Sequence, residues 1–372
     1  MRHITIQAIS LKALHCQLNI IEILLGKFVR WGYEASSILR KPRCCMVSCA
    51  YPFVRLPCDA MSLFSLIAAL LMEQLHPLAS RKYLFAWLGN YVHFFQQHFN
   101  AGEHKHGKIA WLIAVLLPLF GSAALYWLLY RVNPVFAWAL CVLVLYLTMG
   151  FRQFSHYFTD IHRALRDNDL DKARSLLSTW RGAPCNELSA EEVARVTIEE
   201  ALLASHHHVF GVMVWFVIAM LLGLGPSGAV LYRLALFLNA RWGKRNDDEF
   251  GEFGEFARQA CHWMEWLPLR LTAITFAIVG DFEDTVYCWR MQAQSWPDPE
   301  AGIVLASGAG AIGVRLGQPI PQGGLPLDRP ELGIGDEADV DFMQSTVGLV
   351  WRALVFWMVL LLLLWLATLV GG

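Results

Sequence analysis

The stretch HVFGVMVWFVIAMLLGLGPSGAVLYRLALFLNA, residues 208–240, decides the predicted fold. Residues 209–224 form a nearly continuous apolar run without a charge, close to the length that a membrane-spanning helix needs. The Gly-Pro-Ser-Gly segment at 225–228 favours a tight turn, and residues 229–238 are apolar again. The pattern therefore predicts a helical hairpin in a membrane.

Both open ends of this predicted hairpin carry ionisable side chains. They are Glu199, Glu200 and His206 to His208 before it, and Arg241, Lys244 and Arg245 after it. Because the two ends of a hairpin reach the same side of a membrane, we expect these groups to line one aqueous mouth. Adjacent histidines on a helix point in different directions, so we expect a polar lining there and no metal ion.

The overall composition also indicates an integral membrane protein. Of the 372 residues, 56% are hydrophobic and 16% are charged, against about 45–50% apolar and about 25% charged in ordinary soluble domains. This hydrophobic composition makes membrane lipid an expected partner. The formal net charge of −1 gives no general basic surface, so we expect no nucleic-acid partner.

Other apolar segments predict further crossings. Residues 109–130 are expected to span, the segment 131–134 to turn, and residues 135–150 to return. Residues 350–370 form the last predicted span. The apolar segment 265–280 is short and contains a proline and an arginine, so we expect it to be re-entrant or interfacial.

The segment 152–207 changes character, because it is rich in charges of both signs. Ser189 and Glu192 have the spacing of a capping box, which predicts the start of a helix. The basic residues gather in this segment and in the loops on the same side, whereas the opposite turns hold Arg131 alone. By the excess of positive charge in inner loops, the segment is predicted to be a cytoplasmic helical insert. The predicted fold is an all-α, polytopic helical bundle in the bacterial inner membrane, with its polar loops mostly cytoplasmic.

The first sixty residues differ in composition from the rest. Residues 1–60 contain Cys16, Cys44, Cys45, Cys49 and Cys58 and have no clean helical or strand period. We expect an over-extended reading frame with the biological start at Met61, the alternative being a genuine, poorly ordered extension. The cysteines lack the paired spacing of a zinc site, so no metal is predicted there.

Near the C-terminus, glycine spacing suggests a nucleotide-binding loop. Gly308, Gly310 and Gly313 formally match a dinucleotide fingerprint, but no alternation of strand and helix surrounds them. The fingerprint is therefore rejected, and residues 281–349 are expected to form a Gly-rich loop.

Several ordered motifs resemble the CobD/CbiB family of cobalamin-biosynthesis membrane proteins, over residues 61–372. The C-terminal motifs are Glu300-Ala-Gly302, Gly310-Ala-Ile-Gly-Val-Arg-Leu-Gly-Gln-Pro319 and Arg329-Pro-Glu-Leu-Gly333. Those upstream are Leu170-Asp171-x-Ala173-Arg174, Glu199, Gly228-Ala229-x2-Tyr232-Arg233, Gly243-x-Arg245 and Pro268-x-Arg270-Leu271.

The resemblance implies an adenosylcobinamide-phosphate synthase, which joins adenosylcobyric acid to aminopropanol or its phosphate in an ATP-dependent amide ligation. It implies ATP and Mg²⁺ in the reaction, with no tightly bound cofactor. It also implies a catalytic role for Glu199 and substrate or phosphate contacts from seven residues. These are Arg233, Arg245, Arg270, Gly310, Gly313, Arg315 and Gly317.

The chain departs from the family pattern at acidic positions. Leu236 and Asn239 stand where the family shows Asn and Asp, and Cys261-His262 replaces an acidic pair. The element Trp266-x-Pro268-x-Arg270-Leu271 is similar to the AmpE branch of the superfamily, which implies a non-catalytic inner-membrane sensor as the alternative. A transporter is a third hypothesis, raised by the arginine at 233 within an apolar segment.

Overall fold

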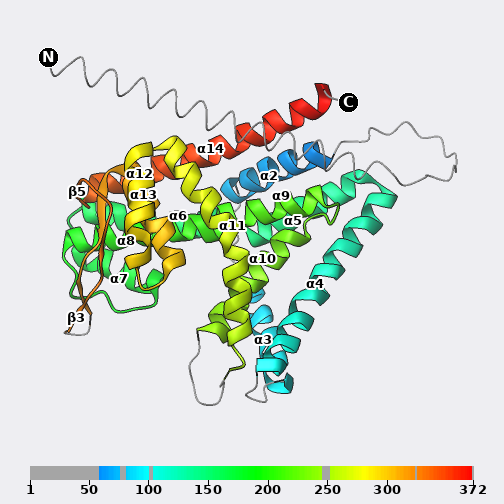
Figure 1. Cartoon of the computed structure of the whole chain (residues 1–372), viewed down its shortest axis with the longest axis horizontal. Helices are drawn as coiled ribbons and strands as arrows, with labels where there is room; N and C mark the ends of the chain where they lie inside the picture. Colours follow the sequence, from blue (N-terminus) through cyan, green and yellow to red (C-terminus); the bar gives the residue numbers. More distant parts are fainter. Residues whose placement is uncertain (1–57, 76–80, 100–103, 245–251, 323–324, 371–372) are drawn as a thin grey trace. The chain divides into compact units, whose positions relative to one another are not determined.

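The computed structural model describes residues 58–75, 81–99, 104–244, 252–322 and 325–370 (Figure 1). Nearly all of the predicted extension at residues 1–60, and the predicted anion contact Arg245, lie outside these described residues. The described chain is predominantly α-helical, which confirms the predicted fold class.

Within the described residues, three helices are long and apolar enough to cross a membrane: Lys105–Val132, Ala190–Leu221 and Val340–Val370. In the first and last, 22% of the most apolar window is buried in the protein, against 61% in the middle one. The middle helix therefore packs within the protein, whereas the other two leave apolar side chains such as Leu117 and Leu363 for lipid. The chain is an all-α membrane protein.

The predicted helical hairpin is present as α9 (Gly211–Leu221) and α10 (Ser227–Leu238). The turn depends on glycine, because Gly223 and Gly225 have φ of +74° and +62°. A Cβ at Gly228 would lie 2.0 Å from the carbonyl oxygen of Trp215, so the two helices cross where one has no side chain. Close packing of the two arms follows from this glycine.

The end of the helical insert, expected at residue 207, lies within a continuous helical stretch. α8 (Ala190–Ser205) continues through a π-helical turn, η1 (His206–Phe210), into α9. No proline interrupts this stretch, and the predicted capping box is confirmed by Ser189 and Glu192, so a single helix leaves the insert and enters the apolar layer.

The N-terminal helices form a second hairpin against this core. α4 (His104–Val132) and α5 (Pro134–Thr148) confirm the predicted pair, and Asn133 caps α5 by accepting a hydrogen bond from the amide of Val135 at 2.9 Å. α2 (Cys58–Leu75) packs against α5, α9 and α14, and α3 (Arg81–Phe99) packs against α4. The insert itself contains α6 (Phe151–Arg166) and α7 (Leu170–Arg181), which pack on α8.

The segment 265–280, expected to be re-entrant or interfacial, belongs to a longer helix, α11 (Glu255–Val279), with Pro268 inside it. The preceding helix α10 ends in a second π-helical turn, η2 (Asn239–Gly243). α11 contacts α4, α10, α13 and α14, so it joins the two hairpins to the C-terminal part of the chain (Figure 1).

The prediction of a Gly-rich loop over 281–349 is wrong, because this segment holds helices and short strands. The helices are α12 (Phe282–Gln292), the 3-10 turn η3 (Ala293–Ser295), α13 (Pro299–Ile312) and the start of α14 (Val340–Val370). The strands are β1 (Val314–Gly317), β2 (Ile320–Gln322), β3 (Leu325–Leu327), β4 (Glu331–Leu332) and β5 (Asp336–Glu337).

The physical reason for this error is that small residues also permit close helix packing. A Cβ at Gly310 would lie 2.6 Å from the carbonyl oxygen of Asp284, and one at Gly308 would lie 2.6 Å from Leu202. β1 pairs antiparallel with β4 and parallel with β5, and β2 pairs antiparallel with β3. Gly308 and Gly310 thus seat α13 against α8 and α12.

Candidate functional site

A buried polar cluster joins η1, α10 and α11 in an otherwise apolar interior. His206 donates or accepts at both ring nitrogens: Nδ1 lies 2.9 Å from Thr272 Oγ1, and Nε2 lies 2.6 Å from Glu265 Oε2. The other oxygen of Glu265 accepts a hydrogen bond of 2.7 Å from the hydroxyl of Tyr232. These four side chains are at most 1% exposed, so their polar atoms satisfy one another away from water.

Local backbone features explain why this cluster forms here. The turns η1 and η2 are both π-helical, a rare conformation that is frequent at functional sites. Gly211 lies directly after η1, and a Cβ there would lie 2.1 Å from the Tyr232 hydroxyl oxygen. The glycine therefore leaves the space in which the tyrosine reaches the carboxylate of Glu265.

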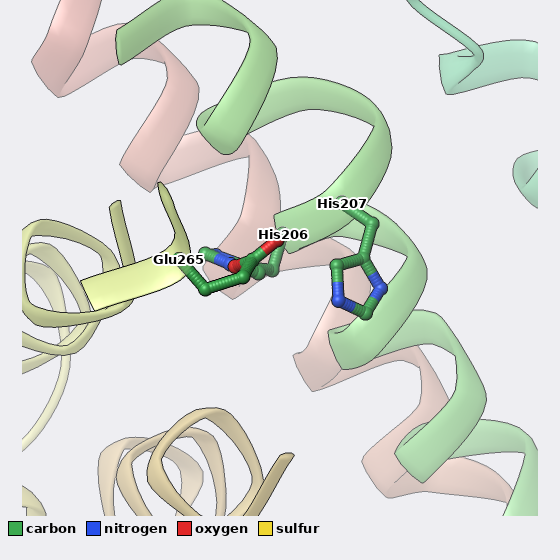
Figure 2. A group of neighbouring side chains, drawn as sticks. All are labelled: His206, His207 and Glu265. Carbon is green, nitrogen blue, oxygen red and sulfur yellow. The ribbon is translucent and has the colours of Figure 1, made fainter. Parts of the chain in front are cut away.

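Two further histidines of η1 extend the cluster. The ring of His207 lies 5.2 Å from that of His206, centroid to centroid, and is half-buried. His208 Nδ1 lies 2.9 Å from Nη1 of Arg233, so the guanidinium donates and this histidine nitrogen accepts. Figure 2 shows the carboxylate of Glu265 extending from α11 to the ring of His206. His207 lies next to His206 on η1.

The cluster continues along α11 toward α13. One turn before Glu265, Cys261 is buried and His262 is exposed. The Nδ1 atom of His262 lies 2.5 Å from Oε1 of Glu300, at the start of α13. Burial raises the pKa of the Glu300 carboxyl, and the hydrogen bond from His262 opposes that shift.

A second buried cluster surrounds Glu199 and Arg329. Arg329 Nη1 donates to Glu199 Oε2 at 2.7 Å, and the amide of Gly317 donates to Glu199 Oε1 at 2.8 Å. The same arginine donates from Nη2 to the carbonyl of Gly317 at 3.1 Å and from Nε to that of Gln318 at 3.2 Å. Glu199 thereby attaches α8 to β1 and to the Arg-Pro-Glu-Leu-Gly segment.

The predicted anion contacts have different surroundings. Arg233 is half-buried beside the histidines of η1. Arg270 lies over the ring of Trp266, 4.1 Å from its centroid, and donates to that residue's carbonyl at 2.8 Å. Arg315 is partly exposed and lies 3.8 Å from Glu331 and 3.7 Å from Glu337. The structure thus places Arg233 at the buried cluster and gives the other two local partners of their own.

The predicted glycines have structural roles in the positions that they occupy. Gly310 lies against the backbone of α12. Gly313 ends α13 in the left-handed conformation, with φ of +74°. Gly317 has φ of +76°, and a Cβ there would lie 2.0 Å from the carbonyl oxygen of Pro330. The lack of a side chain permits close helix packing at Gly310 and a left-handed helix end at Gly313. At Gly317 it permits the close approach of the Pro330 carbonyl.

The sequence did not assign roles to Tyr232, Glu265, Thr272 and Arg329, all of which form the two buried clusters. The available signal was an ionisable or polar residue within a long apolar context, which membrane segments rarely carry without a function. For Arg329, the motif that contains it was recognised, but its partner Glu199 is 130 positions away. The hydrophobic periodicity of a sequence cannot show which residues are in contact when they lie so far apart in the chain.

Comparisons with known proteins agree with the motifs. Residues 66–350 match the model of the family described as CobD/Cbib protein. The chain belongs to the CobD/CbiB family. A cobalamin biosynthesis protein CobD of Stutzerimonas stutzeri is 36% identical over 307 residues, which cover 81% of this chain and 98% of that protein.

Other CobD/CbiB relatives are similar over much of their length. The cobalamin biosynthesis protein CobD of Chromobacterium violaceum is 38% identical over 66% of this chain and 76% of its own. The cobalamin biosynthesis protein CbiB of Salmonella typhimurium is 25% identical over 72% of this chain and 86% of its own. No solved structure matches the chain.

The Mg²⁺ implied by the CobD/CbiB resemblance can be tested against the carboxylates of the two clusters. Mg²⁺ prefers oxygen ligands in octahedral geometry. Glu199 pairs with Arg329, Glu200 lies 3.5 Å from Arg181, Glu265 pairs with His206 and Tyr232, and Glu300 pairs with His262. These carboxylates do not form an oxygen cage that fits Mg²⁺.

Proposed function

We propose that this CobD/CbiB protein acts at the aminopropanol-attachment step of cobalamin biosynthesis, as an adenosylcobinamide-phosphate synthase. The match of residues 66–350 to the family model supports the proposal most strongly. In this reaction, the propionate carboxylate of adenosylcobyric acid takes a phosphoryl group from ATP, giving ADP and an acyl phosphate. The neutral amine of aminopropanol or its phosphate then attacks the acyl carbon, phosphate leaves, and the nitrogen loses one proton and keeps one as the amide N–H.

The buried cluster at η1 supports a role in binding this set of anionic substrates. Arg233 lies at its edge, already oriented by His208, and a guanidinium is a suitable donor to phosphate or carboxylate oxygens. We propose Arg233 as an anion contact. ATP enters as a co-substrate with magnesium carried on its phosphates, because the carboxylates of the two clusters offer no fitting magnesium site.

We propose structural roles for Glu199 and for the remaining predicted contacts. Because Glu199 is 4% exposed and accepts from Arg329 and Gly317, we propose that it positions β1 and does not exchange protons with substrate. Gly310, Gly313, Gly317, Arg270 and Arg315 then shape the C-terminal part of the protein. The proposed location is the bacterial inner membrane, with the insert and C-terminal strands on the cytoplasmic side, where ATP is available.

The alternative is a non-catalytic, AmpE-like sensor of the inner membrane. The observation that favours it is the pairing of every carboxylate in the two clusters, which leaves none of them as an unpartnered base for the incoming amine. The two functions differ in whether the protein must convert a corrinoid.

Complementation separates the two functions. A strain lacking its own synthase, grown where cobalamin is required, is supplied either with adenosylcobyric acid or with adenosylcobinamide. We expect this chain to restore growth on adenosylcobyric acid, whereas adenosylcobinamide restores growth without it. Arg233→Met should reduce that rescue, and Arg241→Met, which changes an exposed arginine near Phe237, should not.

Expression and membrane insertion are measured by immunoblot of the membrane fraction. Wild-type protein that is present at normal levels and fails to support growth on adenosylcobyric acid contradicts the synthase function and favours the sensor. Equal rescue by Arg233→Met and wild type contradicts the proposed anion contact alone.

A further inference from the structure

Three side chains of the buried cluster present metal-ligating atoms to one another. One ligand atom each of His206, His207 and Glu265 lies within 4.8 Å of both others (Figure 2). Two of the residues come from η1 and the third from α11, so the group also joins two helices. We propose that His206, His207 and Glu265 bind one divalent transition-metal ion of the zinc type.

The backbone explains how adjacent histidines converge. In a regular α-helix, successive side chains diverge strongly around the axis, which was the reason for predicting no metal here. His206 and His207 lie in the wider turn of a π-helix, where the angle between successive side chains is smaller. Their rings accordingly approach to 5.2 Å between centroids.

The hydrogen bonds around the cluster resemble the outer partners of a metal site. Thr272 Oγ1 lies 2.9 Å from Nδ1 of His206, and Tyr232 donates to Oε1 of Glu265 at 2.7 Å. These partners leave Nε2 of His206 and Oε2 of Glu265 facing each other at 2.6 Å. Metal-bound histidines and carboxylates are usually held in this way by a hydrogen bond to their second polar atom.

The ligand types select the class of ion. Two imidazole nitrogens and one carboxylate suit Zn²⁺, Co²⁺ or similar ions, whereas Mg²⁺ prefers oxygen ligands alone. Binding replaces the proton between His206 and Glu265, so each ion that enters releases that proton to solvent. Three protein ligands leave a further position for water or for an oxygen of a bound anion.

A buried ion pair without a metal function is the competing explanation. It accounts for His206 and Glu265, which hydrogen-bond to each other, but not for His207, whose half-buried ring lies beside that of His206. His207 therefore separates the two explanations. The inference concerns the chain's own residues and does not depend on the proposed synthase activity.

The test uses the full-length protein in lipid nanodiscs, purified with a tag that contains no histidine. Co²⁺ is titrated in, and the visible ligand-field absorption and the bound metal per chain are measured. We expect one Co²⁺ per chain, displaced by Zn²⁺ and retained in excess Mg²⁺. His207→Gln and Glu265→Gln should each weaken binding by at least about tenfold.

His208→Gln is the matched control, because His208 is adjacent in sequence and contacts Arg233 instead. It should bind Co²⁺ like wild type. Size-exclusion profiles show whether Glu265→Gln folds, and His207→Gln decides the outcome if it does not, since His207 is outside the buried pair. Absence of stoichiometric Co²⁺ from wild type, wild-type affinity in His207→Gln, or an equal loss in His208→Gln each overturns the proposal.

Discussion

Glu199 illustrates how surroundings define the role of a single residue. From the sequence it is a carboxylate at a predicted aqueous mouth, and the resemblance to the CobD/CbiB family implies a catalytic role for it. In the structure it is 4% exposed and joined to Arg329, which is 7% exposed. A buried charge without its partner is strongly unfavourable, so the pair is expected to matter more for folding than an exposed one.

Replacing one member of this pair should destabilise the protein. Glu199→Gln or Arg329→Met is expected to lower the free energy of unfolding by about 3–5 kcal/mol, because the remaining charge stays buried. Arg315→Met, which removes partly exposed ion pairs, should cost at most about 1 kcal/mol. Thermal unfolding in detergent measures all three.

The double variant Glu199→Gln with Arg329→Met completes the cycle. We expect it to be more stable than the sum of the single changes predicts, because no lone charge remains. Additive losses would show that the two side chains act independently and would contradict the assignment of Glu199 as an anchor for β1.

At the scale of elements, α13 shows how glycines can indicate packing and not a loop. Gly310 lies in the last turn of this helix, where α12 approaches so closely that any Cβ would collide with its backbone. By contrast, Gly348 in α14 has no atom within 4 Å of the position of a Cβ. We therefore expect replacement by alanine to change the stability in opposite directions at these two positions.

Gly310→Ala should lower the free energy of unfolding by about 1–3 kcal/mol, because the new methyl group forces α12 and α13 apart. Gly348→Ala should raise it by up to about 1 kcal/mol, since alanine is the better helix former and nothing obstructs it. Melting temperatures of the two variants compare them directly. A neutral Gly310→Ala would mean that α13 does not pack tightly on α12.

The helix α6 carries a pH-sensitive contact. Burial lowers the pKa of His162 below 6.5, nearby Arg166 lowers it further, and Asp341 opposes the shift. The unfolded chain therefore binds a proton at this histidine more readily than the folded protein. Its contribution to stability is complete above about pH 6.5 and is lost as pH falls through 6.5 toward the folded pKa.

We expect the melting temperature of wild type to fall more steeply from pH 7 to pH 5 than that of His162→Gln. His156→Gln, on the same helix, is the control because the His156 side chain is 72% exposed. It should retain the wild-type slope. Identical slopes in wild type and His162→Gln would contradict a lowered pKa at His162.

At the scale of the whole molecule, the open question is which side of the membrane each polar segment faces. The prediction from positive charge puts the insert in the cytoplasm and the turn between α4 and α5 on the opposite side. The expectation that residues 265–280 do not cross the membrane puts β1 on the same side as the insert. Both test positions, Arg315 and Arg131, have exposed or partly exposed side chains. Cys141, Cys185, Cys261 and Cys288 are buried, which limits background labelling at these four positions.

In intact cells, a membrane-impermeant maleimide should label Arg131→Cys and leave Arg315→Cys unlabelled. Both should react after the membrane is permeabilised, which verifies that each cysteine is accessible. Labelling of Arg315→Cys in intact cells would place β1 outside the cytoplasm. That result would separate the Gly-rich C-terminal part from ATP and would contradict the proposed arrangement.

Sequence alone determined the fold class, the helical hairpin, the capping box at Ser189 and the family. These features depend on local patterns and on ordered motifs, which can be identified in the sequence without knowledge of the fold. Glycines were misread over residues 281–349, because a small residue favours a turn and a close helix contact equally.

The tertiary structure decided which polar groups meet. It paired Glu199 with Arg329 across 130 positions, brought Glu265 of α11 to His206 of η1, and gave Arg270 and Arg315 separate partners. The physical reason is that buried polar side chains must find partners within the fold, and those partners are fixed by how helices pack and not by their separation along the chain.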